Sequence, residues 1–352
     1  MGRCRGRRKE KGGKGVIDLV VGGQLGSEGK GSVVSWLSKT QERPFDVSIR
    51  TGSPNAGHTF RCSGKDGALI KMRQLPCSWQ AQRDNVLYVP AGAVINEEVF
   101  CAEVEMVHSR GFTGRILVSP QAAVVDEEAG REVEKAIKTG TTGEGVGATR
   151  ASKCFRSAKL AKDCDRLKPF IPSPSDWLYQ ALAKDSYHLL VESTQGFGLS
   201  MDYFHYPFCT STNLTPYRIL DDAEIPWGAH RVNVWMVLRT FPIRIAGNSG
   251  ALWLETSWEE LRRRYGNHIP VERTTVTDKV RRVGEFDVIA AVDAVHRCRP
   301  NNVVLTFFDY LYPNVKETGL TQQMKQVLSD LSLKIEHRIT HVGVGIGEVL
   351  EV

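Results

Sequence analysis

The sequence lacks the features that mark an exported or membrane-spanning protein. No apolar run approaches the length of a membrane span, and the basic residues 1–15 contain no apolar segment of the kind found in secretory signals. Eight cysteines are present, but no pair has the CxxC spacing and no Cys/His group has the spacing of zinc ligands. We therefore expect a cytoplasmic protein with reduced cysteines and no membrane partner.

Net charge is also scarce outside the N-terminus. The chain of 352 residues carries a formal charge of +6, and residues 1–15 alone carry seven Lys and Arg against Glu10, which is also +6. The remainder is therefore close to neutral. We expect residues 1–15 to be a disordered, solvated tail, with binding of nucleic acid as the less favoured alternative, and residues 16–352 to form a single domain.

Apolar strand patterns alternate with helical patterns and polar loops along the chain. We expect strands at 16–22, 47–50, 86–89, 115–118, 188–192, 235–238 and 303–308. Helices are expected at 30–38, 96–110 and 258–265, and the glycine-rich residues 137–149 are expected to be a loop. This alternation predicts an α/β fold with a mainly parallel central sheet and helices on both faces, with ligands bound beyond the carboxyl ends of the strands.

The first glycine-rich loop, GGQLGSEGKG at 22–31, lies between an expected strand and an expected helix. It lacks the ordinary P-loop pattern, because Gln24 stands where a glycine is required and Gly31 follows Lys30 in place of Ser or Thr. Free backbone amides and the positive end of a helix dipole still favour an anion, and Lys30 would neutralise it. The loop therefore predicts phosphate binding, with Ser27 at its centre.

Four further polar loops have the chemistry of a nucleotide site. Amides, hydroxyls and cations occur in NAGHT (55–59), GTTGEGVG (140–147), ESTQG (192–196) with YPFCTSTN (206–213), and TTVTDKVRRVG (274–284). Side-chain hydroxyls and exposed amides bind phosphate oxygens, the amide of Gln195 suits the edge of a base, and hydroxyls followed by cations suit a small dicarboxylate.

In this order, the loops resemble those of the adenylosuccinate synthetase family, which read approximately GxQWGDEGKG, NAGHT, GTTGRGIGP, EGAQG, YPYVTSSN and TTGRRRRTG. The resemblance extends from about Ile17 to Gly347. It implies a synthetase domain with a P-loop-NTPase-like, adenylosuccinate synthetase-like fold. It also implies a two-step ligation, in which a triphosphate phosphorylates the 6-oxygen of a purine monophosphate and the amine of L-aspartate then displaces that phosphate.

The resemblance assigns roles to individual residues. Those in catalysis would be Ser27, Lys30, His58 and Gln195. The triphosphate would contact Gly26, Ser27, Glu28, Gly29, Lys30, Gly31, Gly57, His58, Thr59, Arg281, Phe307, Asp309 and Gly343. The monophosphate would contact Ser27, Asn55, Thr141, Thr142, Gln195, Thr210 and Lys279, together with Arg156 from the partner subunit of a homodimer. Aspartate would contact Thr275, Val276, Thr277, Lys279 and Arg281, and the cofactor Mg²⁺ would contact Ser27 and Gly57.

Three departures from the family pattern bear on the substrate. Ser27 replaces the aspartate that takes the N1 proton of inosinate, which leaves room beside N1 and C2 for the 2-amino group of guanine. Phe307 replaces the lysine of the TKLD guanine reader, although Asp309 remains, and a stacking aromatic suits adenine. Lys279 replaces an arginine that serves the ribose edge.

These departures are typical of the phage branch of the family, which makes diaminopurine nucleotides. We therefore expect ligation of aspartate to dGMP, with ATP or dATP as phosphate donor. One alternative is ordinary adenylosuccinate synthetase activity with IMP and GTP. Another is an inactive nucleotide-binding module, against which the presence of Lys30, His58, Gln195 and Arg156 argues. For the aromatic pair, the alternative is that Phe307 and Phe308 are strand core.

Overall fold

The computed structural model describes residues 15–62, 67–81, 84–126, 130, 133, 139–140, 143–274 and 278–352. Several predicted features lie outside the described residues, namely most of the basic tail (1–14) and the site residues Thr141, Thr142, Thr275, Val276 and Thr277.

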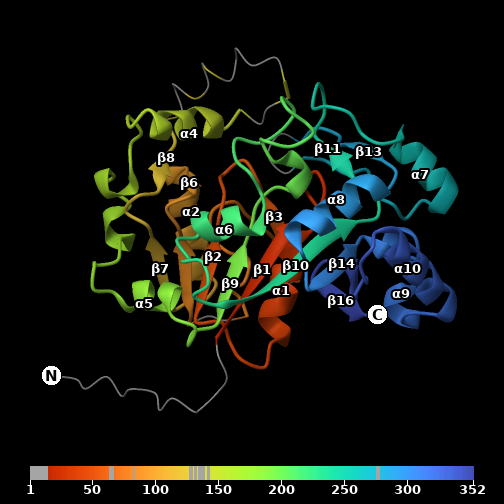
Figure 1. The fold of residues 1–352 in the computed structure, drawn as a ribbon, viewed down its shortest axis with the longest axis horizontal. Helices are drawn as coiled ribbons and strands as arrows, with labels where there is room; N and C mark the ends of the chain where they lie inside the picture. The colour runs from red at the N-terminus through yellow and green to blue at the C-terminus, as the bar shows by residue number, and fades with distance from the viewer. Residues whose placement is uncertain are drawn as a thin grey trace.

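A nine-stranded sheet forms the centre of the molecule (Figure 1). Its strands, in spatial order, are β16 (Glu348–Glu351), β15 (His341–Gly345), β14 (Asn302–Thr306), β10 (Arg231–Arg239), β1 (Val16–Gly22), β9 (Leu189–Glu192), β2 (Val47–Arg50), β5 (Val86–Val89) and β7 (Arg115–Val118). Neighbouring strands are parallel, except for the antiparallel edge strand β16. The predicted mainly parallel sheet is confirmed.

Helices and short sheets surround this centre. The α-helices are α1 (Lys30–Thr40), α2 (Glu97–Ser109), α4 (Val146–Cys154), α5 (Trp177–Ala183), α6 (Pro216–Asp222), α7 (Trp258–Tyr265), α8 (Val288–Cys298), α9 (Val315–Thr318) and α10 (Gln322–Lys334). The short sheets are β3 (His58–Arg61) with β4 (Leu69–Met72), β6 (Val94–Ile95) with β8 (Ala123–Val124), and β11 (Ile243–Arg244) with β13 (Arg282–Gly284) and β12 (Glu255–Thr256). Among the helices of the described residues, none has both the length and the apolar character needed to cross a membrane.

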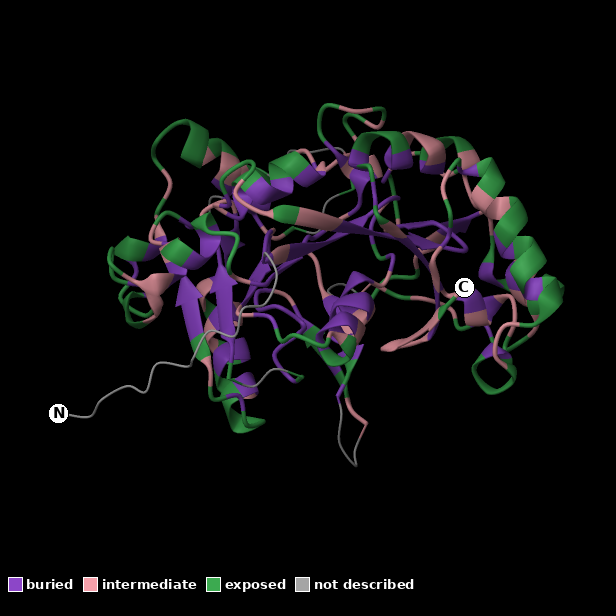
Figure 2. Ribbon diagram, turned by 60° about the horizontal axis from the view of Figure 1, so that its bottom comes forward, coloured by how far each residue is buried: buried purple, intermediate pink, exposed green. Residues whose placement is uncertain are grey.

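Both faces of the central sheet are covered by helices. Alternate residues of each strand point to opposite faces, so a single strand contributes apolar side chains to both. On one face, Leu19 of β1 belongs to the apolar cluster that contains Leu182 of α5 and Leu220 of α6. On the other, Val20 belongs to the cluster that contains Leu37 of α1 and a side chain of α2, Phe100. In Figure 2 most of the central strands are purple, and they lie between helices whose outward faces are green. Burial of each such side chain contributes about 1.5–3 kcal/mol.

A buried polar cluster fixes strand β1 between its two neighbours. The carboxylate of Asp18 accepts hydrogen bonds from Trp235 Nε1 at 2.8 Å and Asn233 Nδ2 at 2.6 Å, both on β10. His188 Nε2, next to β9, lies 2.8 Å from the other carboxylate oxygen. A carboxylate at 3% exposure needs such partners, because an unpaired buried charge is costly. One side chain therefore connects three adjacent strands.

The predicted bounds of β1, β2, β5, β7 and α7 agree with the structure, and those of β9, α1 and α2 differ by one or two residues at an end. Three further predictions need correction. Strand β14 ends at Thr306, short of the expected end at Phe308, because Phe307 has φ 58° and begins a 3₁₀ turn, η4 (Phe308–Tyr310). The expected loop 137–149 is wrong at its end, since α4 begins at Val146 after Gly145 adopts φ 69° and caps the helix. Strand β10 is also longer than the expected 235–238.

Candidate active site

The phosphate loop after β1 is folded around one buried carboxylate. Glu28 is fully buried, and its Oε1 accepts from the backbone N–H of Gly26 at 2.8 Å and of Gln24 at 3.2 Å. Its Oε2 lies 2.7 Å from Nζ of Lys30, which is 2% exposed. Gly29 has φ 86° and precedes helix α1, which begins at Lys30. Because both carboxylate oxygens are engaged, Glu28 supports the loop and is not a free base.

Ser27 lies at the exposed surface of this loop and in contact with two arginines. Its φ is 58°, a left-handed conformation that is uncommon outside glycine, asparagine and aspartate. Its hydroxyl accepts from Nη1 of Arg281, and its carbonyl accepts from Nη1 of Arg239 at 3.0 Å. Ser27 and Arg281 were each predicted to contact the triphosphate, and the structure places them in contact with one another. The local positive charge favours phosphate oxygens.

Arg239, the last residue of β10, connects this loop to the aromatic residue predicted to contact a base. Its side chain is fully buried, forms an ion pair with Glu272 and lies with its guanidinium carbon 4.1 Å from the centroid of the Phe307 ring. The side-chain amide of Gln24 accepts from the backbone N–H of Arg239 at 2.9 Å and donates to its carbonyl at 3.1 Å. Phe307 is half-buried against this cation, whereas Phe308 is fully buried in the core. The core alternative holds for Phe308, although Phe308 lies in the 3₁₀ turn η4 and not in a strand. Phe307 also packs against a smaller apolar cluster that includes Phe241 and Ile243, so the core alternative holds for it in part.

The ends of β14 and β15 approach the phosphate loop from the far side. Thr306 donates from Oγ1 to the carbonyl of Glu28 at 2.6 Å. Gly343 of β15 is packed so closely that an added Cβ would lie 3.1 Å from the Thr306 side chain. Asp309 is half-buried in η4, and burial raises the pKa of its carboxyl group. Two of the predicted triphosphate residues, Gly343 and Asp309, therefore lie in β15 and in the turn after β14, at the same end of the sheet as the phosphate loop.

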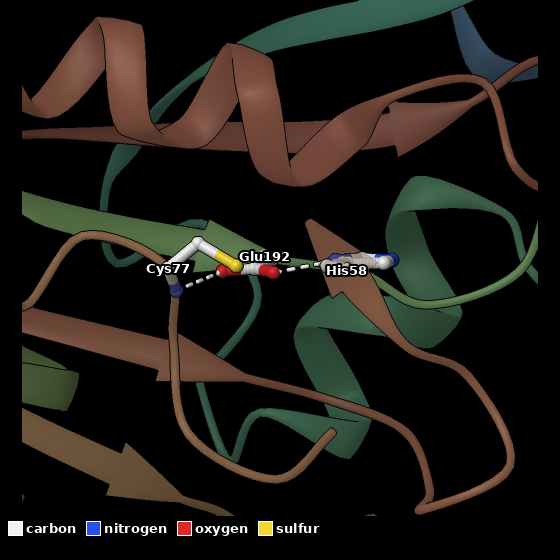
Figure 3. Close-up of side chains that lie close together, drawn as sticks. All are labelled: His58, Cys77 and Glu192. Atoms are coloured by element: carbon white, nitrogen blue, oxygen red, sulfur yellow. Dashed lines mark hydrogen bonds and ion pairs between the residues drawn. The ribbon is translucent and has the colours of Figure 1, made fainter. Parts of the chain in front are cut away.

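His58 lies in a buried cluster of charged groups (Figure 3). Its Nδ1 lies 2.5 Å from Oε1 of Glu192 and 2.9 Å from Nη1 of Arg50. Glu192 also binds Arg50 and accepts from the backbone N–H of Cys77 at 2.7 Å. Figure 3 shows the carboxylate of Glu192 between His58 and Cys77. Arg50 ends β2 and Glu192 ends the adjacent β9, so the sheet itself places this ion pair.

Burial and the neighbouring Arg50 lower the pKa of His58 to about 3, so the imidazole is neutral at physiological pH. Burial alone raises the pKa of Glu192, but the charge of Arg50 and the hydrogen bond from His58 outweigh it and lower the pKa to about 2. An ionised Glu192 accepts hydrogen bonds only, so the shorter contact, with Glu192, places a proton on Nδ1 and leaves a lone pair on Nε2. Arg50 then bonds to Glu192 and not to Nδ1, although the two nitrogens lie 2.9 Å apart. Burial, followed by the charge of Glu192, raises the pKa of the Cys77 thiol.

The ligand atoms of His58, Cys77 and Glu192 all lie within 4.8 Å of one another, a spacing that would suit a metal ion. The guanidinium of Arg50 already provides the cation at the Glu192 carboxylate, and the thiol is protonated because its pKa is raised. The cluster is therefore an ion pair that orients His58. Gly31 completes it, because a Cβ there would lie 2.7 Å from that of His58.

Three of the predicted monophosphate residues, Asn55, Gln195 and Thr210, line one hollow that opens to solvent, and Gln195 has φ 61°. Three other predicted residues, Ser27, Arg156 and Lys279, are not in its lining. Arg156 is exposed beyond the end of α4, and Lys279 is exposed, with its backbone N–H bonded to Thr274. Gly57 and Thr59 are half-buried on either side of His58.

The sequence interpretation missed four charged residues, namely Arg50, Arg239, Glu272 and the role of Glu192. A signal for three of them was present. Arg50, Glu192 and Arg239 are each the last residue of a strand, directly after a buried apolar residue. A charge at that position lies at the edge of the sheet where ligands bind, and it requires a partner from a neighbouring strand. Glu272 lies in no strand or helix and gave no comparable signal.

A parallel α/β sheet with an anion-binding loop after its first strand defines the class as a nucleotide-binding enzyme. The family model described as adenylosuccinate synthetase matches residues 19–165 and 157–319. The chain belongs to the adenylosuccinate synthetase family, whose members are ligases that form C–N bonds.

Relatives with two activities resemble the chain. It is 33% identical over 314 residues to N6-succino-2-amino-2'-deoxyadenylate synthase of Vibrio phage phiVC8, covering 84% of this chain and 87% of the relative. It is 37% identical over 330 residues to adenylosuccinate synthetase of Thermococcus sibiricus, covering 91% and 92%.

Two solved structures share the fold. The first is succinoaminodeoxyadenylate synthetase of cyanophage S-2L, bound to dGMP and dATP, with a TM-score of 0.81, 25% identity and coverage of 96% of this chain and 95% of that one. The second is fully ligated adenylosuccinate synthetase of Plasmodium falciparum, with a TM-score of 0.79, 18% identity and coverage of 97% and 100%. The second likeness concerns the fold alone.

Proposed function

We propose that this enzyme joins L-aspartate to C6 of dGMP, with ATP or dATP as phosphate donor, and forms N6-succino-2-amino-2'-deoxyadenylate. The observation that carries the proposal is Ser27, whose small hydroxyl occupies the centre of the phosphate loop where the family has an aspartate. Ser27 is exposed and contacts Arg281, so it lies where a substrate would meet the loop. A hydroxyl leaves space beside N1 and C2 of the purine, where guanine carries its amino group.

Overall sequence identity does not separate the two activities, because the archaeal adenylosuccinate synthetase is 37% identical to this chain and the phage enzyme is 33% identical. The choice therefore rests on side chains at the site. A solved relative of similar fold binds dGMP and dATP, which supports a guanine monophosphate with an adenine triphosphate. Phe307 supports the same pairing, since an aromatic face stacks on adenine and lacks the charge of the family lysine.

The proposed reaction has two balanced steps. First, O6 of dGMP attacks the γ-phosphorus of the triphosphate, the bond to the β-phosphate oxygen breaks, and the N1 proton is released. Second, the α-amine of aspartate attacks C6 and the C6–O bond breaks, so inorganic phosphate leaves and the amine loses a proton. Lys30 and the amides of the loop would hold the negative charge that moves between phosphate groups.

His58 would stabilise the phosphoryl group during its transfer. In the ligand-free chain its pKa is lowered to about 3, first by burial and then by the charge of Arg50. A triphosphate beside it would oppose that shift, because negative charge favours the imidazolium form. We propose that Nε2 then gains a proton and donates a hydrogen bond to a phosphoryl oxygen, while Glu192 holds the ring through Nδ1.

The residues present fit Mg²⁺ bound chiefly by substrate phosphates. The Ser27 hydroxyl and the Gly57 carbonyl are oxygen ligands, which Mg²⁺ prefers, and the nearby Glu28 carboxylate is already engaged by Lys30. When bound, the ion would neutralise charge on the triphosphate. Arg281 and Lys279 would hold aspartate. Arg156, which is exposed, would reach the monophosphate of a second subunit in a homodimer.

Product formation with purified enzyme tests this proposal directly. The enzyme is mixed with Mg²⁺, aspartate and each pair of monophosphate (dGMP, GMP or IMP) and triphosphate (ATP, dATP or GTP), and products are separated by chromatography. We expect the highest kcat/KM with dGMP and an adenine triphosphate. Activity with IMP and GTP but not with dGMP would instead identify an ordinary adenylosuccinate synthetase. Binding of dGMP without phosphate release would identify an inactive module.

A further inference from the structure

One cation in the monophosphate hollow has no assigned role. Arg150 lies in α4 and lines the same hollow as Asn55, Thr210 and Gln195. Its Nη2 donates to the carbonyl of Gly92 at 3.3 Å. Its Nε is buried and has no hydrogen-bond partner in the described part of the chain. A buried guanidinium nitrogen without a partner is costly, and this nitrogen is available to donate to a ligand in the hollow.

The position of Arg150 is fixed from within the chain. Lys153, one turn further along α4, donates to the carbonyls of Ala91 at 2.7 Å and Gln121 at 2.8 Å. Figure 1 shows α4 beside the short strands β6 and β8. Together with the bond from Arg150 to Gly92, these contacts attach the helix to the loop that precedes β6. Little reorganisation would therefore be needed for Arg150 to meet a ligand.

The hollow is built for an anion. Hydroxyls and amides line it, and among its described lining residues Arg150 is the one Lys or Arg side chain. The single carboxylate in the lining, Asp222, forms an ion pair with Arg218 on the same helix at 2.9 Å. Burial raises the pKa of this carboxyl group, and the charges of Arg150 and Arg218 oppose that shift, so two arginines counter one carboxylate.

We propose that Arg150 binds the 5'-phosphate of the substrate nucleotide from within the same subunit. This inference rests on the proposed function, because it takes the hollow to be the nucleotide monophosphate site. Arg150 provides a planar donor group for a phosphate dianion, beside the hydroxyl of Thr210 and the amide of Asn55. The subunit would then hold the monophosphate with its own cation, and Arg156 of a second copy would add to a site that already has one.

The test compares a ligand that carries the phosphate with one that lacks it. Dissociation constants for dGMP and deoxyguanosine are measured by calorimetry for wild type, Arg150→Met and Arg150→Lys. We expect Arg150→Met to weaken dGMP roughly 10- to 100-fold and deoxyguanosine less than about twofold, since a charge-assisted hydrogen bond to phosphate is lost. Arg150→Lys keeps a charge but loses the planar donors, so we expect an intermediate loss for dGMP.

Arg263→Met is the matched control, because it removes an exposed arginine that pairs with Glu260 on α7 and does not line the hollow. We expect it to change both dissociation constants by less than about threefold. Equal losses for dGMP and deoxyguanosine in Arg150→Met, or no loss for dGMP, would overturn the inference. If Arg150→Met does not fold, Arg150→Lys alone decides by the same comparison. If wild type binds IMP and not dGMP, the proposed function fails, and IMP against inosine then tests Arg150 independently.

Discussion

The guanidinium of Arg239 lies 4.1 Å from the centre of the Phe307 ring and donates to the backbone carbonyl of Ser27 at 3.0 Å. One buried cation therefore contacts both the centre of the phosphate loop and the aromatic residue that follows β14. Attraction between a cation and an aromatic face holds the ring in a defined orientation. Arg239 therefore links the loop that would hold the triphosphate chain to the side chain that would hold its base.

Phe307→Leu should weaken binding of the triphosphate. We expect its KM for ATP to rise roughly 5- to 150-fold with the KM for dGMP unchanged, because stacking on a base is worth about 1–3 kcal/mol. Initial rates at varied ATP and fixed, saturating dGMP and aspartate measure this. The control is Phe308→Leu, since Phe308 is fully buried in the core. It should lower the melting temperature and leave the KM for ATP unaltered. A normal KM in Phe307→Leu would remove the ring from the triphosphate site.

Ser27→Asp should reduce the use of dGMP. The larger carboxylate would return beside the 2-amino group, so we expect kcat/KM with dGMP to fall by at least about tenfold, or about 1.4 kcal/mol. Stability should not fall, because aspartate tolerates the left-handed conformation of Ser27 at least as well as serine does. Ser27→Ala separates size from hydrogen bonding. It should keep the preference for dGMP over IMP, whereas a switch to IMP in Ser27→Ala would show that the hydroxyl, and not the space, selects the base.

The buried His58 should make the protein lose stability as the pH falls from 6.5. Its pKa is about 3 in the folded state and 6.5 as the reference value, so between these values the unfolded state binds more protons and stability rises with pH. From pH 6.5 to 4.5 the loss should be about 2 kcal/mol. Glu192, whose pKa is lowered to about 2, acts in the same sense only below about pH 4.5. Urea unfolding at the two pH values measures the change.

His58→Gln should remove this part of the pH dependence, because glutamine does not titrate. His296→Gln is the control, since His296 is exposed and pairs only with the exposed Glu336. An unaltered pH dependence of unfolding in His58→Gln would mean that His58 is protonated in the folded protein.

Glu28→Gln should disturb the phosphate loop. The new amide nitrogen would face either the N–H of Gly26 or Nζ of Lys30, so two donors would oppose one another in a buried site. We expect a cost of about 1–3 kcal/mol, seen as a lower melting temperature and a higher KM for the triphosphate. Glu259→Gln, an isosteric change on the exposed surface of α7, should change neither. A large loss of kcat with an unaltered KM would instead identify Glu28 as the group that removes the N1 proton.

The sequence predicted well those parts of the fold that depend on local pattern. The bounds of β1, β2, β5, β7 and α7 agree residue for residue, since apolar runs and a Ser-capped, Glu-rich first turn are local signals. The long-range ion pairs were not predicted. Arg239 pairs with Glu272 33 positions away, and Arg50 with Glu192 142 positions away. No spacing rule connects such residues, because only the strand order of the sheet brings them together.

The same reasoning applies to the site. The predicted loops meet where parallel strands end, as general rules for α/β sheets require. Side-chain engagement follows no such rule. The sequence placed Glu28 only among the triphosphate contacts, and its two hydrogen bonds and its ion pair became evident only from the folded loop. Arg150 was overlooked because residues 146–149 were expected to be loop, which hid that Arg150 lies on a helix facing the hollow.

The Asp18 cluster has a consequence for the opposite end of the sheet. Its hydrogen bonds join the starts of β1, β9 and β10, whose far ends carry the phosphate loop, Gln195 and Arg239. If one strand slid by two residues along its neighbour, these bonds would break, and its loop would be displaced by about 7 Å relative to the others. Asp18 therefore fixes the register of the three strands, and with it the relative positions of the three loops that follow them. Substitutions there would misalign the reacting groups without touching any of them.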